Sequence, residues 1–494
     1  MLFNSINYVI FFPIVLLLYL LFPKKVKPVW LLLCSYFFYM CWNPKYVVLI
    51  LFTTLATYGC ALFIGKAEKI SAKKTWVGVC VGINLAILFL FKYFDFFLDN
   101  LNKIMSRFGM GTLSSPFHFL LPVGISFYTF QAIGYVIDVY RGDIKAEKNI
   151  IDYALFVSFF PQLVAGPIER SRNLLPQIKS IKEKNLFSYD NLVSGFGTIL
   201  WGLFMKMVIA DRALLVVDQI FGRYYQYGTV ELVLGAFLFS VQIYADFAGY
   251  SYIAIGSARI LGIRLMENFN TPYFSLSIAD FWSRWHISLS TWFKDYVYIP
   301  LGGNRKGKLR KYLNLFITFL VSGLWHGAAW HYVAWGVLHG FYRVFGEITG
   351  KIRGKITEKL GVDNKPFSFR FGKALITCIL VGIAWIFFRA PSIGVAADYI
   401  KRMFTCPNFW VLSNESLYML GLDRREAFIL FAALLALVAV AVIRRVKKEE
   451  IGVFLARQNL WFRWVLFLVL IACILLFGEY GEDFSSAKFI YFDF

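Results

Sequence analysis

The sequence predicts an all-α polytopic membrane protein, and two of its features support this prediction. Of its 494 residues, 59% are hydrophobic and 16% are charged, and the mean hydropathy is +0.61. Soluble domains are less hydrophobic and more highly charged. Apolar runs of about 18 or more residues recur from end to end, and each is long enough to cross a bilayer as a helix. The short alternating segments of a membrane barrel are missing from the sequence.

The five clearest apolar runs mark five of the expected membrane spans. These runs begin at Ile6, Tyr46, Trp76, Ala427 and Trp461. By the length criterion the chain holds roughly ten to twelve plausible spans. We find no soluble domain, low-complexity linker or convincing repeat between them. The sequence therefore predicts one integral membrane domain over residues 1–494.

Basic loops between the runs predict the topology, because cytosolic loops are enriched in lysine and arginine. Lys24, Lys25 and Lys27 follow the first run instead of preceding it. That order argues against a cleaved signal peptide and places the N-terminus outside. The other loops expected in the cytosol are KAEKISAKK (from Lys66), RGDIKAEKN (from Arg141), ERSRNLLPQIKSIKEK (from Glu169), NRKGKLRK (from Asn304), KIRGKITEK (from Lys351) and RRVKKEE (from Arg444).

These loops also place two less obvious segments. The run YALFVSFFPQLVAG, from Tyr153, lies between two cytosolic loops, so we expect it to be re-entrant or buried. If RRVKKEE is cytosolic, the last span carries the C-terminal tail, residues 479–494, to the extracytoplasmic side.

The formal net charge of +21 has two compatible explanations. One is the bias of cytosolic loops together with attraction to anionic membrane lipid. The other is a cationic cytosolic face that concentrates an anionic, phosphorylated substrate. No motif for DNA or RNA binding supports a nucleic-acid partner. The seven cysteines mostly lie in apolar runs without a CxxC pair, so we interpret them as small core residues.

The central block, at about residues 245–345, differs from the flanking runs. Residues 249–303 are rich in aromatic and polar side chains, too polar for lipid-facing helices. Irregular or short helical backbone at membrane depth must be buried in protein or line a watery cavity. We therefore interpret this part as the folded-in floor of a central cavity.

Four of the five histidines fall in this block, whereas His118 lies outside it and is given no role. The four are His286, His326, His331 and His339. Ionisable groups at membrane depth are costly and mark functional sites. Metal binding is not favoured: His326 and His331 are about 140° apart around a helix. No HExxH motif, acidic cluster or Cys/His spacing accompanies them.

Two chemical roles remain for the neighbourhood of His326. Ser322 lies one turn earlier on the same helix face and is a possible nucleophile, but no GxSxG elbow surrounds it. A hydroxyl bonded back to its own helix is the alternative. A histidine with a pKa near 6.5 suits a general base that removes a proton from a hydroxyl. A purely structural, hydrogen-bonding histidine is the competing interpretation.

The neighbours of His326 favour a narrow site. Gly323 and Gly327 lack side chains, so a substrate or another backbone can approach closely. Trp325 and Trp330 are expected to wall the site and exclude water.

Other polar residues of the block have mainly structural interpretations. Asp280 and Arg284 are spaced to form an ion pair on a short helix. His286, in DFWSRWHIS, is either a supporting scaffold or a direct participant. For Asp246, in QIYADFAGY, pairing with a basic residue is favoured over catalysis.

These motifs resemble those of a known family. RWHISLSTWFKDYVYIPLGG followed by LWHG resembles the membrane-bound O-acyltransferase superfamily. The start, MLFNSINYVIFFPIVLLLY, and PQLVAGPIER (Pro161 to Arg170) look like its alginate O-acetyltransferase branch. The similarity covers nearly the whole chain. The D-alanyl-transferring protein of teichoic acid modification is a more distant relative.

The resemblance implies a fold and a reaction. The fold would be a ring of helices around a thin central funnel, with His326 catalytic at its bottleneck and His286 as the second histidine of the pattern. Members of this branch take an acyl group from a cytosolic thioester and pass it across the membrane for O-acylation of a cell-surface polysaccharide. An extracytoplasmic partner, often SGNH hydrolase-like, usually completes the transfer.

The last residues add a further resemblance. FIYFDF, from Phe489, resembles an FxYxxF motif whose tyrosine, here Tyr491, is proposed to carry the acyl group. An aromatic anchor at the membrane interface is the alternative.

The resulting predictions are specific. We expect a plasma (inner) membrane enzyme with no bound cofactor and no metal, using acetyl-CoA or another acyl thioester as donor. The assigned residues are catalytic His326 and His286, the candidate acyl carrier Tyr491, and candidate substrate-binding Trp325, Ser322, Arg284 and Asp246. D-alanyl transfer from a carrier protein is the alternative within acyl transfer. A membrane transporter and a non-catalytic scaffold are the alternatives outside it.

Overall fold

The fold is entirely helical within the part of the chain that is described. The computed structural model describes residues 1–115, 121–164, 166–183, 187–363 and 365–480, and no strand occurs in these ranges. The chain divides into two compact units, Met1–Ile199 with Ile253–Met266 and Leu200–Tyr252 with Glu267–Phe494. Helices α10 (Tyr189–Leu203) and α12 (Thr229–Ile260) each contribute residues to both units.

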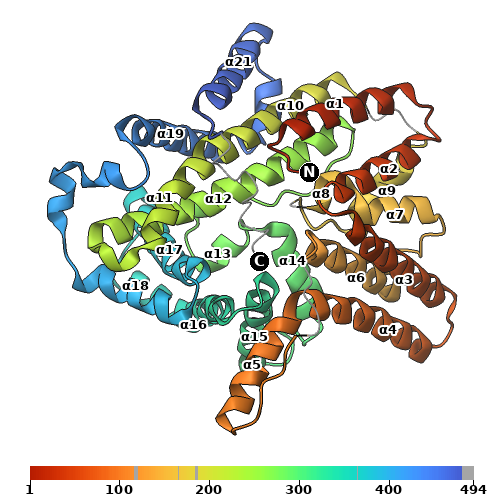
Figure 1. Cartoon of the computed structure of the whole chain (residues 1–494), viewed down its shortest axis with the longest axis horizontal. Coiled ribbons are helices and arrows are strands. Elements are labelled where there is room, and N and C mark those ends of the chain that lie inside the picture. The colour runs from red at the N-terminus through yellow and green to blue at the C-terminus, as the bar shows by residue number, and fades with distance from the viewer. Residues whose placement is uncertain (116–120, 165, 184–186, 364, 481–494) are drawn as a thin grey trace. The chain divides into compact units, whose positions relative to one another are not determined.

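The first unit holds the N-terminal helices, red to yellow in Figure 1. They are α1 (Ile6–Leu21), α2 (Lys27–Met40), α3 (Val47–Lys66), α4 (Ile70–Leu88), α5 (Phe94–Arg107), α6 (Ile125–Arg141), α7 (Ile150–Ser158), α8 (Phe160–Leu163) and α9 (Ser171–Ser180). A π-helical turn, Phe89–Tyr93, joins α4 to α5.

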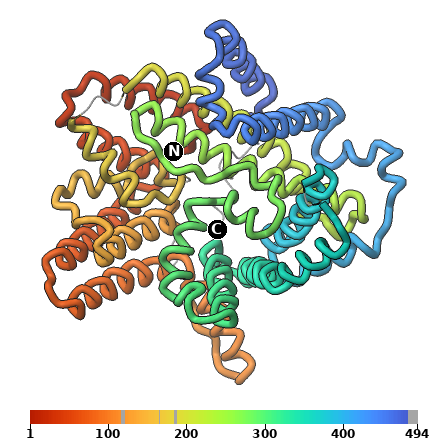
Figure 2. Tube along the Cα trace, turned by 180° about the vertical axis from the view of Figure 1, so that it is seen from behind, coloured from red at the N-terminus to blue at the C-terminus, as the bar shows by residue number. Residues whose placement is uncertain are grey.

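The second unit holds the green to blue helices, which Figure 2 shows from behind. They are α11 (Asp211–Gly222), α13 (Ile278–Trp282), α14 (Ile287–Phe293), α15 (Lys308–His326), α16 (Trp330–Lys359), α17 (Phe367–Arg389), α18 (Ile393–Thr405), α19 (Arg424–Lys447), α20 (Ile451–Ala456) and α21 (Leu460–Phe477). The short helices α13 and α14 and the irregular chain before them form most of the aromatic, polar block that the sequence sets apart. The expectation of short or irregular backbone is wrong for its first residues, 249–260, which belong to the long helix α12.

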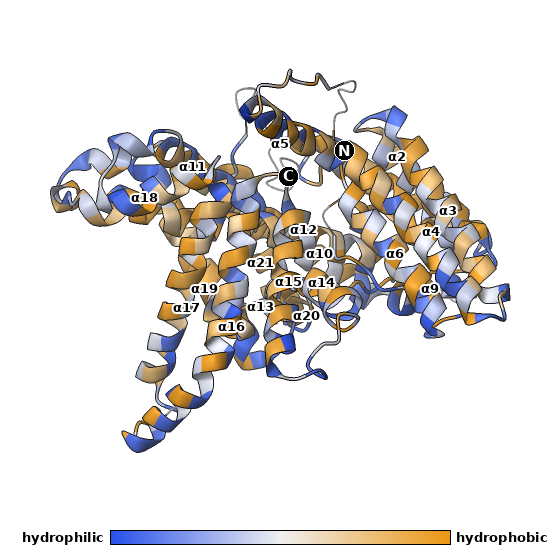
Figure 3. Cartoon of the chain, turned by 90° about the horizontal axis from the view of Figure 1, so that it is seen from below, coloured by the Kyte–Doolittle hydropathy of each residue, from blue (hydrophilic) through white to orange (hydrophobic). Residues whose placement is uncertain are grey.

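Seven helical stretches of the described chain are long and apolar enough to cross a membrane. Figure 3 shows the apolar residues along α3, α17, α19 and α21. In α19 and α21 only 11% and 17% of the apolar window is buried within the protein. Such exposed apolar surface is stable in lipid and costly in water. The chain is thus a multi-pass membrane protein. Other apolar runs form shorter helices, such as α1, α2 and α6, or helices with charged ends, such as α15 and α16.

The run from Tyr153 is buried, as the loop topology predicts. It forms the short helices α7 and α8, in which Tyr153, Phe156 and Phe160 are fully buried. At the break between the helices, the side-chain amides of Gln131 and Gln162 donate to the carbonyl oxygen of Phe156 at 2.6 and 2.8 Å. Irregular backbone within a membrane protein requires such internal partners.

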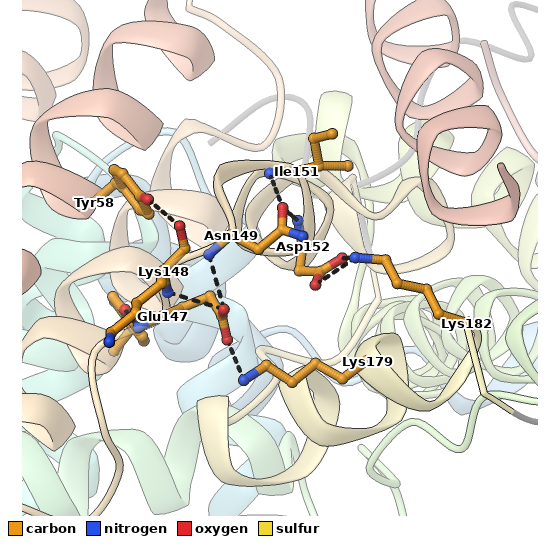
Figure 4. A network of polar contacts seen from close by, with 9 residues as sticks. Tyr58, Glu147, Lys148, Asn149, Ile151, Asp152, Lys179 and Lys182 are labelled. Atoms are coloured by element: carbon orange, nitrogen blue, oxygen red, sulfur yellow. Dashed lines mark hydrogen bonds and ion pairs between the residues drawn. The ribbon is translucent and has the colours of Figure 1, made fainter. Parts of the chain in front are cut away.

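A polar network holds the start of α7, as Figure 4 shows. The carboxylate of Glu147 accepts the backbone N–H groups of Lys148 and Asn149 at 2.9 Å and pairs with Lys179. A second ion pair joins Asp152 in the first turn of α7 to Lys182, at 2.7 Å. The first pair connects the basic loop before α7 to the one after it, and the second connects the first turn of α7 to that same later segment. The α7–α8 segment therefore returns to the side from which it starts, as expected of a re-entrant segment.

We expect the substitution Glu147→Gln to lower the free energy of unfolding by about 1–3 kcal/mol. Glutamine leaves Lys179 without its counter-charge, and its amide cannot accept both backbone N–H groups as strongly as a carboxylate. The midpoint of thermal unfolding in detergent measures the effect. Glu183→Gln, at an exposed position of the following loop, is the matched control. Equal midpoints for both variants would contradict a stabilising role for the network.

Candidate active site

His326 is the last residue of α15, and glycine contacts bring this end of the helix against α16. A Cβ atom on Gly323 would lie 2.4 Å from the carbonyl oxygen of Tyr332 and 3.2 Å from the Cα of Gly336. A Cβ on Gly327, which ends the helix, would lie 2.1 Å from the ring of Tyr332. Only glycine fits at such distances. The sequence predicts that these glycines allow the close approach of either a substrate or another backbone. The structure shows that another part of the chain, in α16, approaches them closely.

Aromatic rings surround His326, which is only 3% exposed. The ring centroids of Trp325, Trp335 and Phe388 lie 5.0, 4.9 and 5.4 Å from that of the imidazole, all edge-on. The expected wall of Trp325 is present. The expectation for Trp330 is wrong, because this side chain is 52% exposed. Trp335, five residues further along α16, contacts His326 instead.

His286 lies immediately before α14 in a left-handed backbone conformation, with φ of 43°. This conformation is uncommon for a residue with a side chain, so the surroundings must hold it. Its Nδ1 lies 3.3 Å from the Oδ1 of Asn268, which also accepts the hydroxyl of Ser288 at 2.6 Å. The N–H of Ile287 donates to the carbonyl oxygen of Asn268 at 2.9 Å. The side chain of His286 is fully buried.

The structure brings the two predicted histidines together on one tryptophan. The indole of Trp325 lies 6.2 Å from the ring of His286 and 5.0 Å from that of His326, measured between centroids. Their positions in the sequence are forty residues apart. His326 and His286 are thus both buried and enclosed by aromatic rings, a setting to which water has little access.

The two remaining histidines of the block have structural partners. The Nδ1 of His331 donates to the carbonyl oxygen of Phe387 at 3.1 Å. The indole N–H of Trp282 donates to the Nδ1 of His339 at 3.2 Å, which places the proton of a neutral His339 on Nε2. No group of three or more potential ligands that could hold a metal ion occurs in the described ranges.

The other predicted residues are placed as follows. Ser322 is buried one turn before His326. The Nε of Arg284 pairs with Asp280 at 2.7 Å, which confirms the expected ion pair. Tyr491 lies outside the described residues.

Asp246 pairs with a basic residue, as the sequence favours, and the partner is Lys206. The ammonium group of Lys206 lies 2.6 Å from Asp246 and 2.8 Å from Asp211, and all three side chains are nearly inaccessible. Lys206 lies within a π-helix, Phe204–Ala210, that joins α10 to α11. Such insertions widen the helical turn and recur at functional sites. Nothing in the sequence alone indicates that Lys206 is the partner.

The end of the described chain is bonded to the π-helix that contains Lys206 and to the start of α11. Arg212 pairs with the carboxylate of Glu479 at 2.6 Å and donates to the carbonyl oxygen of Phe477 at 2.8 Å. The backbone N–H of Glu479 donates to the carbonyl oxygen of Met207 in the π-helix at 3.1 Å. The C-terminal tail therefore starts from a fixed position in the second unit.

Comparison of the sequence with known proteins gives matches over most of the chain. Residues 143–357 match the model of the membrane-bound O-acyltransferase (MBOAT) family. The chain is 42% identical over 409 residues to the probable alginate O-acetylase AlgI of Pseudomonas putida, covering 82% of this chain and 80% of that protein. It is 38% identical to the peptidoglycan O-acetyltransferase of Helicobacter pylori, covering 78% and 74% of the two chains. The teichoic acid D-alanyltransferase of Bacillus subtilis is 31% identical, covering only 45% and 58%.

Proposed function

Since this chain belongs to the membrane-bound O-acyltransferase family, we propose that it transfers an acetyl group from a cytosolic thioester to a cell-surface or exported polysaccharide. The most extensive similarities support the acetyl group, because the relatives that share about four fifths of the chain are named as O-acetylases or O-acetyltransferases. D-alanyl transfer has less support, because the relatives with that name share less than half of the chain.

The observation that carries this proposal is the buried pair of histidines on Trp325. His326 lies in an aromatic enclosure, where a neutral imidazole is a competent base and few waters compete with the acceptor. His286 is fixed by Asn268 and by its own backbone, so it is suited to hold the Trp325 side of the enclosure in place.

The proposed reaction uses few groups. The oxygen of an acceptor hydroxyl bonds to the thioester carbonyl carbon while His326 takes the hydroxyl proton. The tetrahedral oxyanion then collapses, the carbon–sulfur bond breaks, and the proton passes to the leaving thiolate. The oxyanion needs a hydrogen-bond donor. The indole N–H of Trp335 is buried next to His326 and has no acceptor among the described residues, so it is the donor that we assign.

Three further elements complete the proposal. The donor is acetyl-CoA, a substrate that arrives from the cytosol. The protein resides in the plasma (inner) membrane. Tyr491 receives the acetyl group, and an extracytoplasmic SGNH-like partner or the glycan itself takes it onward. The predicted exterior location of the tail supports this route.

Mass spectrometry of the C-terminal peptide, after incubation of the purified protein with acetyl-CoA, tests the proposal. We expect a mass increase of one acetyl group on Tyr491 in the wild-type protein and none in Tyr491→Phe. An unmodified wild-type peptide, with acetyl-CoA bound and added glycan acetylated, would remove the tyrosine from the route. No acetyl transfer to any acceptor would contradict the proposed function.

A further inference from the structure

A cavity of about 650 Å³ opens beside the helices α13 and α14 and the end of α19. This volume lies within the range of about 300–1,000 Å³ that is typical of small-molecule sites. Its lining residues, all in the second unit, are Glu267, Asn270, Arg284, Arg444, Arg445, Lys448, Glu449, Glu450 and Val453. The segment RRVKKEE, which the positive-inside rule places in the cytosol, contributes more than half of this lining.

The acidic residues of the lining are mostly matched by two arginines. Glu267 pairs with Arg444, whose other Nη donates to the hydroxyl of Tyr252 at 2.6 Å. Glu449 pairs with Arg457. Glu450 interacts electrostatically with Arg444. Two of the three lining carboxylates are thus ion-paired, and the third, Glu450, shares Arg444 with Glu267.

Among the described residues, Arg445 and Lys448 lack such an ion pair, whereas Arg284 pairs with Asp280 at 2.7 Å. Within the described part of the chain, no carboxylate lies within ion-pair distance of Arg445 or Lys448. Arg445 instead donates to the carbonyl oxygen of Phe274 at 3.2 Å and lies over its ring, 5.2 Å from the centroid. The positive charges of Arg284 and Arg370 act on Arg445, opposed by the negative charge of Asp280. Like charges held close together are costly unless an anion joins them.

Backbone contacts fix one wall of the cavity to the candidate active site. The N–H of Asn270 donates to the carbonyl oxygen of Arg284 at 2.9 Å, and the N–H of Ile287 donates to that of Asn268 at the same distance. Arg284 and Asn270 line the cavity, whereas His286 and Asn268 bond to each other away from solvent. Arg284 is only two positions before His286, at most about 7 Å of chain. A ligand in the cavity thus lies next to the backbone that carries His286.

We propose that Arg284, Arg445 and Lys448 bind the phosphate groups of coenzyme A, the phosphorylated part of the thioester donor. Guanidinium and ammonium groups form strong, charge-assisted hydrogen bonds to phosphate oxygens. The pantetheine arm would then direct the thioester toward Trp325 and His326. This inference rests on the proposed function, because it assigns a place to the donor of that reaction.

A binding measurement on the full-length protein in detergent tests the site. The probe is desulfo-coenzyme A, which lacks the reactive sulfur, and calorimetry gives its Kd. We expect the double variant Arg445→Gln/Lys448→Met to raise the Kd at least about tenfold, because it removes two charge-assisted contacts. Arg445→Lys, which keeps the charge, should retain most of the affinity. Lys355→Met, at an exposed position of another basic segment, is the matched control.

Each outcome distinguishes this inference from the proposed function. Unchanged affinity in a double variant that melts like the wild type would overturn the site. So would a wild-type protein that does not bind the probe. Normal probe binding without acetyl transfer would overturn the proposed function alone. A lipid headgroup offers similar phosphate chemistry. If the double variant loses phosphatidylglycerol adducts in native mass spectrometry but keeps its affinity for the probe, the cavity is a lipid site.

Discussion

The substitution His326→Ala is expected to lower the rate of acetyl transfer about 10²–10⁴-fold while the protein remains folded. Alanine removes the only proton acceptor that we assign to the reaction. The surrounding rings of Trp325, Trp335 and Phe388 remain in place. The measurement is the initial rate of acetyl incorporation from labelled acetyl-CoA, with melting temperature as a check on folding.

His331→Ala is the matched control for this substitution. His331 is also a largely buried histidine near the start of α16, but its ring bonds to the backbone of Phe387. We expect it to lose stability without a loss of rate of comparable size. Equal rate losses in both variants would indicate that any buried histidine of this region affects the rate through packing, and would contradict the assignment of His326 as the base.

The substitution Lys206→Met is expected to destabilise the protein by about 3–5 kcal/mol. Methionine has nearly the length of lysine but leaves the carboxylates of Asp211 and Asp246 buried without their shared cation. An isolated buried charge is far costlier than a buried ion pair. The free energy of unfolding in detergent, from a denaturant titration followed by tryptophan fluorescence, measures the loss.

The triple variant Lys206→Met/Asp211→Asn/Asp246→Asn separates charge from packing. It removes all three charges together, so we expect it to recover much of the stability that the single variant loses. A single variant within about 1 kcal/mol of the wild type, or a triple variant less stable than the single one, would contradict this account of the ion cluster.

Features that depend on neighbours in the sequence were predictable. The ion pair of Asp280 and Arg284 follows from their spacing on one helix, and the burial of the run from Tyr153 follows from the basic loops on both sides of it. The long apolar helices follow from composition and length. His286 and His326 were singled out from their motifs, and their roles stay predictions.

Contacts between distant segments were not predictable in this way. Trp335 reaches His326 because glycines let α15 and α16 approach closely. The position of Trp330 in the sequence gives no sign that its side chain is exposed. The pairing of Lys206 with Asp246 depends on a π-helical turn, which widens the helix and alters which residues share a face. Hydrophobic periodicity contains no such information.

The ion pair between Arg212 and Glu479 fixes the position from which the C-terminal tail begins. Tyr491 is twelve positions after Glu479, so at most about 40 Å of chain separates it from that point. A group confined to such a volume experiences an effective concentration on the order of millimolar. Delivery of Tyr491 to a thioester at His326 would then be unimolecular. Its rate would not depend on the density of the protein in the membrane, whereas the same motif supplied on a separate chain would have to find the enzyme by diffusion.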